Sequence, residues 1–349
     1  MYMRRCLQLA ANGLGRVRPN PLVGCVVVKD GRIISEGYHQ EYGHNHAERN
    51  ALLRVGTCHV ASPQGATLYV NLEPCSHYGK TPPCADLIIE KGISRVVCCN
   101  DDPNPLVAGN GFRKLEAAGI EVTRHILHDE GRELNRRFFT FMEQQRPYVI
   151  LKWAESADGF MAPESLTEQN ESEKTLTEKT GTNRIRIHSD NSVRDIPDSV
   201  NSVRDIPDSV NSVRAYWLST QRQNRLNHRW RTEEAAILVG SETFLLDNPS
   251  LTPRHYLGPA PQRVVLDRRG RIADIPDWIR LQTPTVEETL HTLYELKIQS
   301  VIVEGGRKIL DAFITSGLYD EVRVLRSPSA LGGGLASPKV PEGVRTMVF

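Results

Sequence analysis

The sequence has almost no net charge and no apolar run long enough to cross a bilayer. Its 43 basic and 42 acidic side chains leave a formal charge of +1, which gives no reason to expect nucleic acid or an acidic membrane as a partner. No apolar stretch approaches the roughly 20 residues of a transmembrane helix. After Arg4 and Arg5 the N-terminal apolar residues are interrupted by Gln8 and Asn12, too early for a secretory signal. We therefore expect a cytoplasmic protein.

Cysteine is scarce, and its number is odd. Seven cysteines in 349 residues are typical of reduced intracellular thiols and not of a disulfide framework. Five of them lie in apolar or ordinary surroundings and are interpreted as small buried hydrophobes. These five are Cys6, Cys25, Cys58, Cys98 and Cys99. The other two, Cys75 and Cys84, belong to a candidate metal-binding motif.

The chain is long for one hydrophobic core and comfortable for two domains. We place the boundary at residues 145/146, next to a polar linker that contains Pro147. In the first domain, predicted helices alternate with predicted strands, which favours a three-layer α/β sheet with parallel pairing in its later part. The expected strands are 23–28, 32–37, 67–70, 95–99 and 121–123, and the expected helices are 1–13, from 46 onward, 85–91, 112–118 and 127–142.

The strongest chemical signal is a set of metal-ligating residues between His46 and Cys84. His46, Cys75 and Cys84 supply one imidazole and two thiolates, a three-ligand set that suits zinc with a fourth position open for water. Glu48 is two residues from His46 and is expected to carry protons instead of binding the metal. Pro74 is expected to start a helix at Cys75. A zinc-free group of buried thiols is the alternative, and His44 is interpreted as a neighbour and not a ligand.

His-x-Glu followed by Pro-Cys-x-x-Cys is the known signature of zinc deaminases. Here eight residues separate Cys75 from Cys84, where that signature has two. The run Leu72 to Cys84, with Pro19 to Gly24 before it and Asp102 to Val107 after it, closely resembles the bifunctional riboflavin biosynthesis deaminase-reductases. The resemblance implies a cytidine deaminase-like fold for the first domain, with zinc as its metal.

In the resembled family the substrate is a diaminohydroxypyrimidine that carries a phosphoribosylamino group. Asn20 lies in a Pro-flanked turn and is expected to present its amide to the edge of the pyrimidine ring. His77 and Lys80 are expected to contact the phosphate. A solvated loop charge is the alternative for Lys80.

Residues 146–349 resemble the reductase half of the same family, a fold similar to dihydrofolate reductase. Apolar strands that end in polar or Gly-rich turns follow one another in the family's order, from Tyr148 to Gly306. Gly305 and Gly306 precede a helix, so free backbone N–H groups can hold a phosphate there. The resemblance implies NADPH as cofactor, bound by Ala154, Trp217, Thr243, Asp247, Gly306, Arg307 and Lys308. It also implies substrate contacts from Lys152, Arg231, Leu251, Arg254 and Glu304. For Lys152 and for each arginine, an ordinary structural or surface role is the alternative.

The sequence departs from the family at about residues 163–215. A ten-residue unit, Asn191 to Val200, recurs as Asn201 to Val210 and begins a third time. The composition there is too polar to offset the entropy of ordering, so we expect a disordered or weakly ordered insertion. The insertion either has no function or forms a loop that contacts a partner or another subunit. Ala215 replaces a small hydroxyl residue expected at that position.

Three functions are compatible with these observations. The leading hypothesis is a bifunctional, homo-oligomeric riboflavin biosynthesis enzyme: a zinc deaminase followed by an NADPH-dependent reductase that acts on one small molecule. The second hypothesis is a deaminase whose reductase domain has lost its activity and serves as a scaffold. A nucleic-acid base deaminase is the third, disfavoured by the Cys75 to Cys84 spacing and by the balanced charge.

Overall fold

The computed structural model describes residues 1–55, 62–78, 82–104, 108–163 and 218–349. By their contacts these residues divide into two compact units. The larger unit comprises Met1–Trp153, Gln221–Leu325 and Pro338–Phe349, and the smaller comprises Ala154–Thr220 and Arg326–Ser337. Residues 164–217, which include nearly all of the predicted insertion and Ala215, lie outside the described residues. The 145/146 boundary therefore stays a prediction.

The N-terminal sheet has five strands in the order β2-β1-β3-β4-β5. Its strands are β1 (Gly24–Lys29), β2 (Arg32–Tyr38), β3 (Thr67–Leu72), β4 (Arg95–Asn100) and β5 (Glu121–Thr123). β1 pairs antiparallel with β2 and with β3, whereas β3, β4 and β5 are parallel. The predicted strands and the parallel pairing in the later part of the sheet are thus confirmed.

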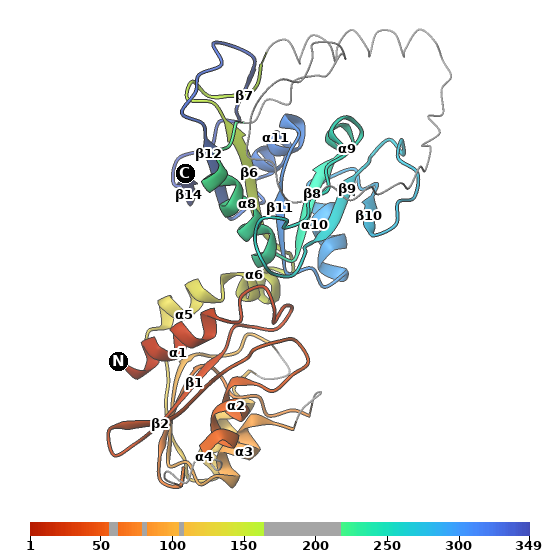
Figure 1. Cartoon of the computed structure of the whole chain (residues 1–349). Helices are drawn as coiled ribbons and strands as arrows, with labels where there is room; N and C mark the ends of the chain where they lie inside the picture. The colour runs from red at the N-terminus through yellow and green to blue at the C-terminus, as the bar shows by residue number, and fades with distance from the viewer. Residues whose placement is uncertain (56–61, 79–81, 105–107, 164–217) are drawn as a thin grey trace, which may run out of the picture. The chain divides into compact units, whose positions relative to one another are not determined.

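Helices cover both faces of this sheet (Figure 1). They are α1 (Tyr2–Ala11), α2 (Ala47–Val55), α3 (Cys84–Glu90), α4 (Asn110–Ala117) and α5 (His128–Leu134), and α6 (Arg136–Gln144) follows α5 at the end of the sheet. One apolar core lies between α1 and the sheet and contains Cys6 and Cys99. The other lies under α2, α3 and α4 and contains Cys25 and Cys98. The expected three layers are therefore present, and these four thiols are buried as predicted, while Cys58 lies outside the described residues.

The single helix expected over residues 127–142 is wrong. Two helices, α5 and α6, meet at Asn135, whose backbone departs from helical geometry. The buried Asn135 side chain bonds both backbone polar groups of Leu22: its Oδ1 accepts from the Leu22 N–H at 2.8 Å and its Nδ2 donates to the Leu22 carbonyl at 2.9 Å. Because this long-range pairing satisfies polar groups that would otherwise be buried alone, it outweighs the local preference for a continuous helix.

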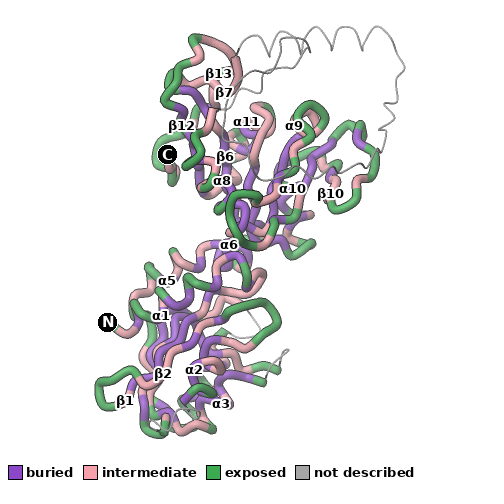
Figure 2. The backbone as a smooth tube through the Cα atoms, in the orientation of Figure 1, coloured by how far each residue is buried: buried purple, intermediate pink, exposed green. Residues whose placement is uncertain are grey.

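A second sheet has seven strands in the order β10-β9-β8-β11-β6-β12-β14. Its strands are β6 (Tyr148–Glu155), β8 (Ala236–Gly240), β9 (Gln262–Leu266), β10 (Trp278–Leu281), β11 (Ser300–Val303), β12 (Glu321–Arg326) and β14 (Thr346–Val348). The run from β10 to β6 is parallel throughout. Its helices are α8 (Gln221–Glu233), α9 (Ser241–Asp247), α10 (Val286–Glu295) and α11 (Arg307–Ser316). Figure 2 shows that the centre of this sheet is buried: β8 and β11 are buried along their whole length, whereas the edge strands β10 and β14 are largely half-buried or exposed.

The smaller unit contains the two-stranded pairing of β7 (Phe160–Ala162) with β13 (Leu335–Ala336). Asp158 organises its turn: the carboxylate accepts from the N–H groups of Leu331 at 3.0 Å and Gly332 at 2.7 Å. Hydrogen bonds from Ser156 and from these backbone groups lower the pKa of Asp158 to about 2. Among the helices in the described ranges, none has the length and hydropathy of a membrane span.

Candidate active sites

Two connections, β2 to α2 and β3 to α3, bring the predicted metal ligands together. His46 lies in the connection from β2 and immediately precedes α2, Cys75 follows β3, and Cys84 is the first residue of α3. The expectation that Cys75 itself begins a helix is wrong, because residues 73–76 are irregular and the helix starts at Cys84. The helix still acts on Cys75: the N–H of Cys84 donates to Cys75 Sγ at 3.3 Å, and the N–H of Ala85 donates to the Cys75 carbonyl at 3.1 Å.

The geometry of this set fits zinc. His46 Nδ1 lies 3.6 Å from Cys75 Sγ and 3.5 Å from Cys84 Sγ, and all three ligand atoms lie within 4.8 Å of one another. Tetrahedral zinc with Zn–S of about 2.3 Å and Zn–N of about 2.0 Å separates sulfur from nitrogen by about 3.5 Å. Within the described residues this is the one such group of histidine, cysteine and acidic side chains. The three residues can therefore hold the ion with little rearrangement.

The two thiols are poised for deprotonation by a metal. A hydrogen bond from Cys84 lowers the pKa of the Cys75 thiol to about 4, against the opposing effect of burial. The pKa of Cys84 is raised, because Cys84 holds the proton that the pair shares and is itself buried. A bound cation takes the place of that shared proton, since the thiolate is the ligand.

Glu48 lies in the first turn of α2 and is 3% exposed. Burial raises the pKa of Glu48 to about 7. His46, Cys75 and Glu48 line one cavity of about 380 Å³, which is large enough for a pyrimidine ring with a substituent. The carboxyl group is therefore inside the space that a substrate of the metal centre would occupy.

Asn20 and His77 line the same cavity, Asn20 half-buried and His77 exposed. Lys80 lies outside the described residues. The exposed His44 side chain points its Nε2 to within 3.8 Å of Glu41 and is absent from the ligand group, in keeping with its interpretation as a neighbour.

The sequence did not predict three polar residues that help to build this cavity. His39 lines it and is 2% exposed, and Asp102 lines it from the segment after β4. Burial raises the pKa of Asp102 to about 7. Glu73 is 4% exposed and holds that segment, because its carboxylate accepts from the N–H groups of Asp102, Gly109 and Gly111 at 3.3, 3.0 and 2.9 Å. A lone histidine and a carboxylate that binds only backbone leave no spacing pattern in a sequence.

In the C-terminal part of the larger unit, Glu304 joins two of the predicted substrate residues. Lys152 Nζ on β6 donates to Glu304 Oε1, and Arg231 Nη2 on α8 donates to Glu304 Oε2 at 3.1 Å. Burial alone would raise the pKa of Glu304, but the two cations lower it to about 2. Residues 152, 231 and 304, far apart in the sequence, thus form one buried cluster that contains two positive charges and one negative charge.

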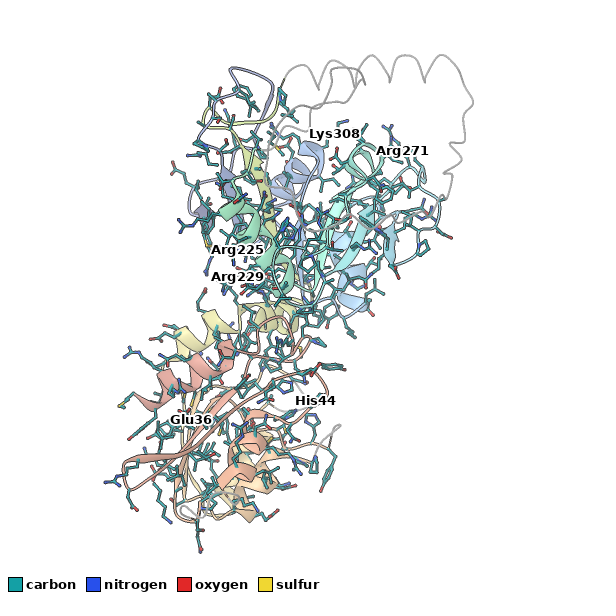
Figure 3. The ribbon with its side chains drawn as sticks, viewed as in Figure 1. Glu36, His44, Arg225, Arg229, Arg271 and Lys308 are labelled. Atoms are coloured by element: carbon teal, nitrogen blue, oxygen red, sulfur yellow. The ribbon has the colours of Figure 1, made fainter. Side chains whose placement is uncertain are left out.

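The N-terminus of α11 fits an anionic cofactor group. Gly305 and Gly306 have φ of 122° and 63°, which favours glycine, and the Gly306 N-cap has no side chain to occupy the helix N–H groups. A Cβ on Gly306 would lie 3.3 Å from Thr243 Oγ1, so Thr243 borders this space. Arg307 and Lys308 follow; Lys308 is seen at the start of α11 in Figure 3, with its Nζ 3.4 Å from Glu242.

The remaining predicted reductase residues are dispersed. Leu251 is buried, Arg254 is exposed, and Asp247 is exposed at the end of α9. Ala154 belongs to the smaller unit, and Trp217 lies outside the described residues. Of the predicted cofactor residues, the structure thus gathers Thr243 with the start of α11.

Two family models match the chain. The cytidine and deoxycytidylate deaminase zinc-binding region matches residues 1–100, and the RibD C-terminal domain matches residues 147–346. The riboflavin biosynthesis protein RibD of Aquifex aeolicus is 35% identical over 96% of this chain and 88% of that protein. A diaminohydroxyphosphoribosylamino-pyrimidine deaminase of Buchnera aphidicola is 47% identical over 42% of this chain and 97% of its own length.

Solved structures agree with these relatives. The crystal structure of a deaminase/reductase from Thermotoga maritima is 35% identical and superposes with a TM-score of 0.76, covering 96% of this chain and 88% of that one. The predicted fold class is therefore confirmed: a cytidine deaminase-like domain and a reductase domain. Zinc belongs to the first and NADPH to the second. The chain belongs to the RibD family, the bifunctional deaminase-reductases of riboflavin biosynthesis.

Proposed function

We propose that the first site deaminates 2,5-diamino-6-(5-phosphoribosylamino)pyrimidin-4-one by hydrolysis. The reaction consumes one water, releases ammonia and leaves a carbonyl on the ring. The Thermotoga relative is named as a deaminase of a phosphoribosylamino-pyrimidine, which supports this substrate class. The observation that carries the proposal is the triangle of His46, Cys75 and Cys84 ligand atoms, two of whose residues line one cavity together with the buried Glu48.

Each residue of the first site has a defined task. Zinc, held by His46, Cys75 and Cys84, would lower the pKa of a water so that it can act as a nucleophile near neutral pH. Glu48 would accept the proton of the attacking water and deliver it to the amine nitrogen that leaves. Asn20 holds the edge of the ring, and His77 and Lys80 hold the phosphate.

For the second site we propose reduction of the ribosyl side chain of the deaminated product to a ribityl chain. NADPH, when bound, is the reductant. The opened sugar gains a hydride and a proton, and Lys152, which donates to Glu304, would orient the sugar hydroxyls or supply the proton. Arg231, Leu251 and Arg254 would complete the substrate site, since guanidinium groups bind phosphate well.

The cofactor would lie over the start of α11. Gly306, Arg307 and Lys308 would bind its phosphates through backbone N–H groups and positive charge. Further contacts would come from Ala154, Trp217, Thr243 and Asp247. The open helix N-terminus beside Thr243 supports this assignment.

We further propose that the enzyme works in the cytoplasm as a homo-oligomer on small molecules. The six cysteines among the described residues are unpaired, which suits a reducing compartment that also holds NADPH. Light scattering of the purified protein would test the oligomeric state, for which a single-chain mass would contradict the proposal.

The function is tested by giving zinc-loaded protein the diaminopyrimidine ribosyl phosphate with NADPH. Ammonia release and the fall in NADPH absorbance are followed together. Both signals at comparable rates are the expected result. Ammonia without NADPH oxidation would support a deaminase with a decayed reductase domain. The absence of both signals would contradict the proposed function.

A further inference from the structure

His39 is a buried polar side chain of the deaminase cavity to which the reaction assigns no task. It directly follows β2, and its backbone N–H donates to the Val23 carbonyl at 2.9 Å. The imidazole is 2% exposed and lies edge-on to the His46 ring, with 5.5 Å between the ring centroids. Both of its nitrogens have partners: Nδ1 lies 3.0 Å from the Asn45 carbonyl oxygen, and Nε2 lies 3.1 Å from Asn20 Nδ2.

These two contacts determine where the protons are. A carbonyl oxygen only accepts, so His39 Nδ1 carries a hydrogen and donates to Asn45. The partners of the ring are a carbonyl and an amide, and the ring is almost fully buried, which favours the neutral imidazole. In a neutral imidazole the other nitrogen accepts, so Nε2 accepts from the Asn20 amide nitrogen.

The orientation of the Asn20 amide follows. An asparagine side chain can turn over at little cost and offer either its oxygen or its nitrogen to a ligand. With Nδ2 bound to His39, the oxygen Oδ1 is the amide atom that Asn20 can offer to the cavity it lines. A carboxamide presented in this way recognises an N–H or amino group and does not recognise a carbonyl oxygen.

We propose that His39 is a positioning residue that fixes the Asn20 amide with its oxygen toward the substrate, so that the cavity selects a pyrimidine edge with a hydrogen-bond donor. This rests on the proposed function and extends it. His39 acts on the substrate only through Asn20. A histidine that merely supports the loop before His46 would have the same burial, but its loss would affect zinc binding and would not depend on residue 20.

The test uses four zinc-loaded proteins: wild type, His39→Asn, Asn20→Ala and the double variant. Asparagine reproduces the Nδ1 position, so it can keep the bond to Asn45 while it loses the acceptor for Asn20. His39→Asn should raise the KM for the diaminopyrimidine ribosyl phosphate about ten-fold, with kcat within about two-fold and zinc content unchanged. In the Asn20→Ala background the same change should add less than about two-fold, because the residue through which His39 acts is gone.

His39→Gln is the matched control. Glutamine places its terminal amide near the Nε2 position and should therefore keep the KM close to the wild-type value. It also serves as the test variant if His39→Asn does not fold. An equal rise in KM from His39→Asn with and without Asn20 would overturn the proposal. Loss of zinc from both His39 variants would also overturn it, since His39 would then support the metal loop.

If the proposed function is wrong, the wild-type protein itself would release no ammonia, which distinguishes this outcome from the variant effects above. The equilibrium affinity of the zinc-loaded proteins for the pyrimidine would then be compared across the same variants. The coupling between residues 39 and 20 would be read from those affinities, so the inference about His39 would still be decided.

Discussion

At the scale of single residues, the proposed roles assign proton transfer to Glu48 and metal binding to His46, Cys75 and Cys84. Glu48 is not a member of the ligand group, yet it lines the cavity beside two of the ligands. A side chain that moves protons without holding the metal can be altered without loss of zinc. This separation makes the role of Glu48 directly testable.

Glu48→Gln should leave zinc bound and lower the rate of ammonia release by about a thousand-fold, because the amide cannot carry the proton. Zinc content and ammonia release check the two halves of the prediction. Glu41→Gln, a change of an exposed glutamate in the loop before His46, is the control and should alter neither. Ammonia release near the wild-type rate in Glu48→Gln would show that another group moves the proton.

Asp247, a proposed cofactor contact, offers a test of whether the two activities are separate. Asp247→Ala should raise the KM for NADPH about ten-fold by removing a cofactor contact, while ammonia release stays unchanged. The single-domain Buchnera relative is named as a deaminase and aligns with 42% of this chain, which supports the independence of the first activity. Glu295→Ala, on the exposed end of α10, is the control. Equal loss of both activities would argue against separate sites.

At the scale of secondary structure elements, the site depends on how closely helix α2 packs on strand β2. A Cβ added at Gly37 would lie 2.5 Å from both the Ala47 carbonyl oxygen and the Ala51 nitrogen. This contact fixes the start of α2, which carries Glu48 and adjoins His46. Both contacting atoms belong to the helix backbone, so the helix itself would have to move.

Gly37→Ala should therefore destabilise the protein by about 3 kcal/mol and reduce ammonia release, since α2 must shift away from β2. Urea unfolding and the ammonia assay measure the two effects. Ile33→Ala, a truncation of a partly exposed side chain on the same strand, should cost less than about 1 kcal/mol. If the two variants are equally stable, the close approach of α2 is not essential.

The sequence predicted the elements of the first domain better than their ends. Apolar periodicity placed the strands correctly because their side chains alternate against two cores. It missed the break at Asn135, which depends on a bond to Leu22, 113 residues away in the chain. The helix predicted at Cys75 was also wrong. That prediction used only the local preference of Pro74 for a helix start, whereas the bond between the Cys84 N–H and Cys75 Sγ requires the folded loop.

The metal ligands could be predicted because zinc demands specific residue types, and those types are rare enough to be noticed. The role of His39 could not be predicted, because a single histidine forms no sequence motif and its proposed role depends on two tertiary contacts. In the reductase half, Glu304 pairs with Lys152 and Arg231, which are far from it in the sequence. The family resemblance implied these residues, but no sequence pattern predicted that they form ion pairs with one another.

At the scale of the whole molecule, buried ion pairs connect segments that are far apart in the chain. Arg137 on α6 makes two bonds of 2.7 and 2.5 Å to Glu234, which is fully buried, and Arg323 adds a third at 3.3 Å. Burial alone would raise the pKa of Glu234, but Arg137 and Arg323 lower it to about 2. A carboxylate with a lowered pKa stabilises the fold only while it is ionised.

The free energy of unfolding should therefore fall as the pH is lowered from about 4.5, the value of an unfolded glutamate, towards the folded pKa near 2. A shift of this size corresponds to about 3 kcal/mol for Glu234. Urea unfolding across this pH range measures it. Glu234→Gln should be less stable at neutral pH, since Arg137 loses its carboxylate partner and Arg323 keeps only Glu321, and its stability should depend less on pH in that window. An unchanged pH dependence in the variant would contradict the role of Glu234.

In the proposed function, one chain first deaminates and then reduces the same small molecule. The most direct test is NADPH consumption by Glu48→Gln with each of two substrates. With the diaminopyrimidine ribosyl phosphate, NADPH oxidation should stop, because the deaminated intermediate is not formed. With 5-amino-6-(5-phosphoribosylamino)uracil supplied directly, it should proceed at the wild-type rate. NADPH oxidation at the wild-type rate from the diaminopyrimidine would contradict the order of the two reactions.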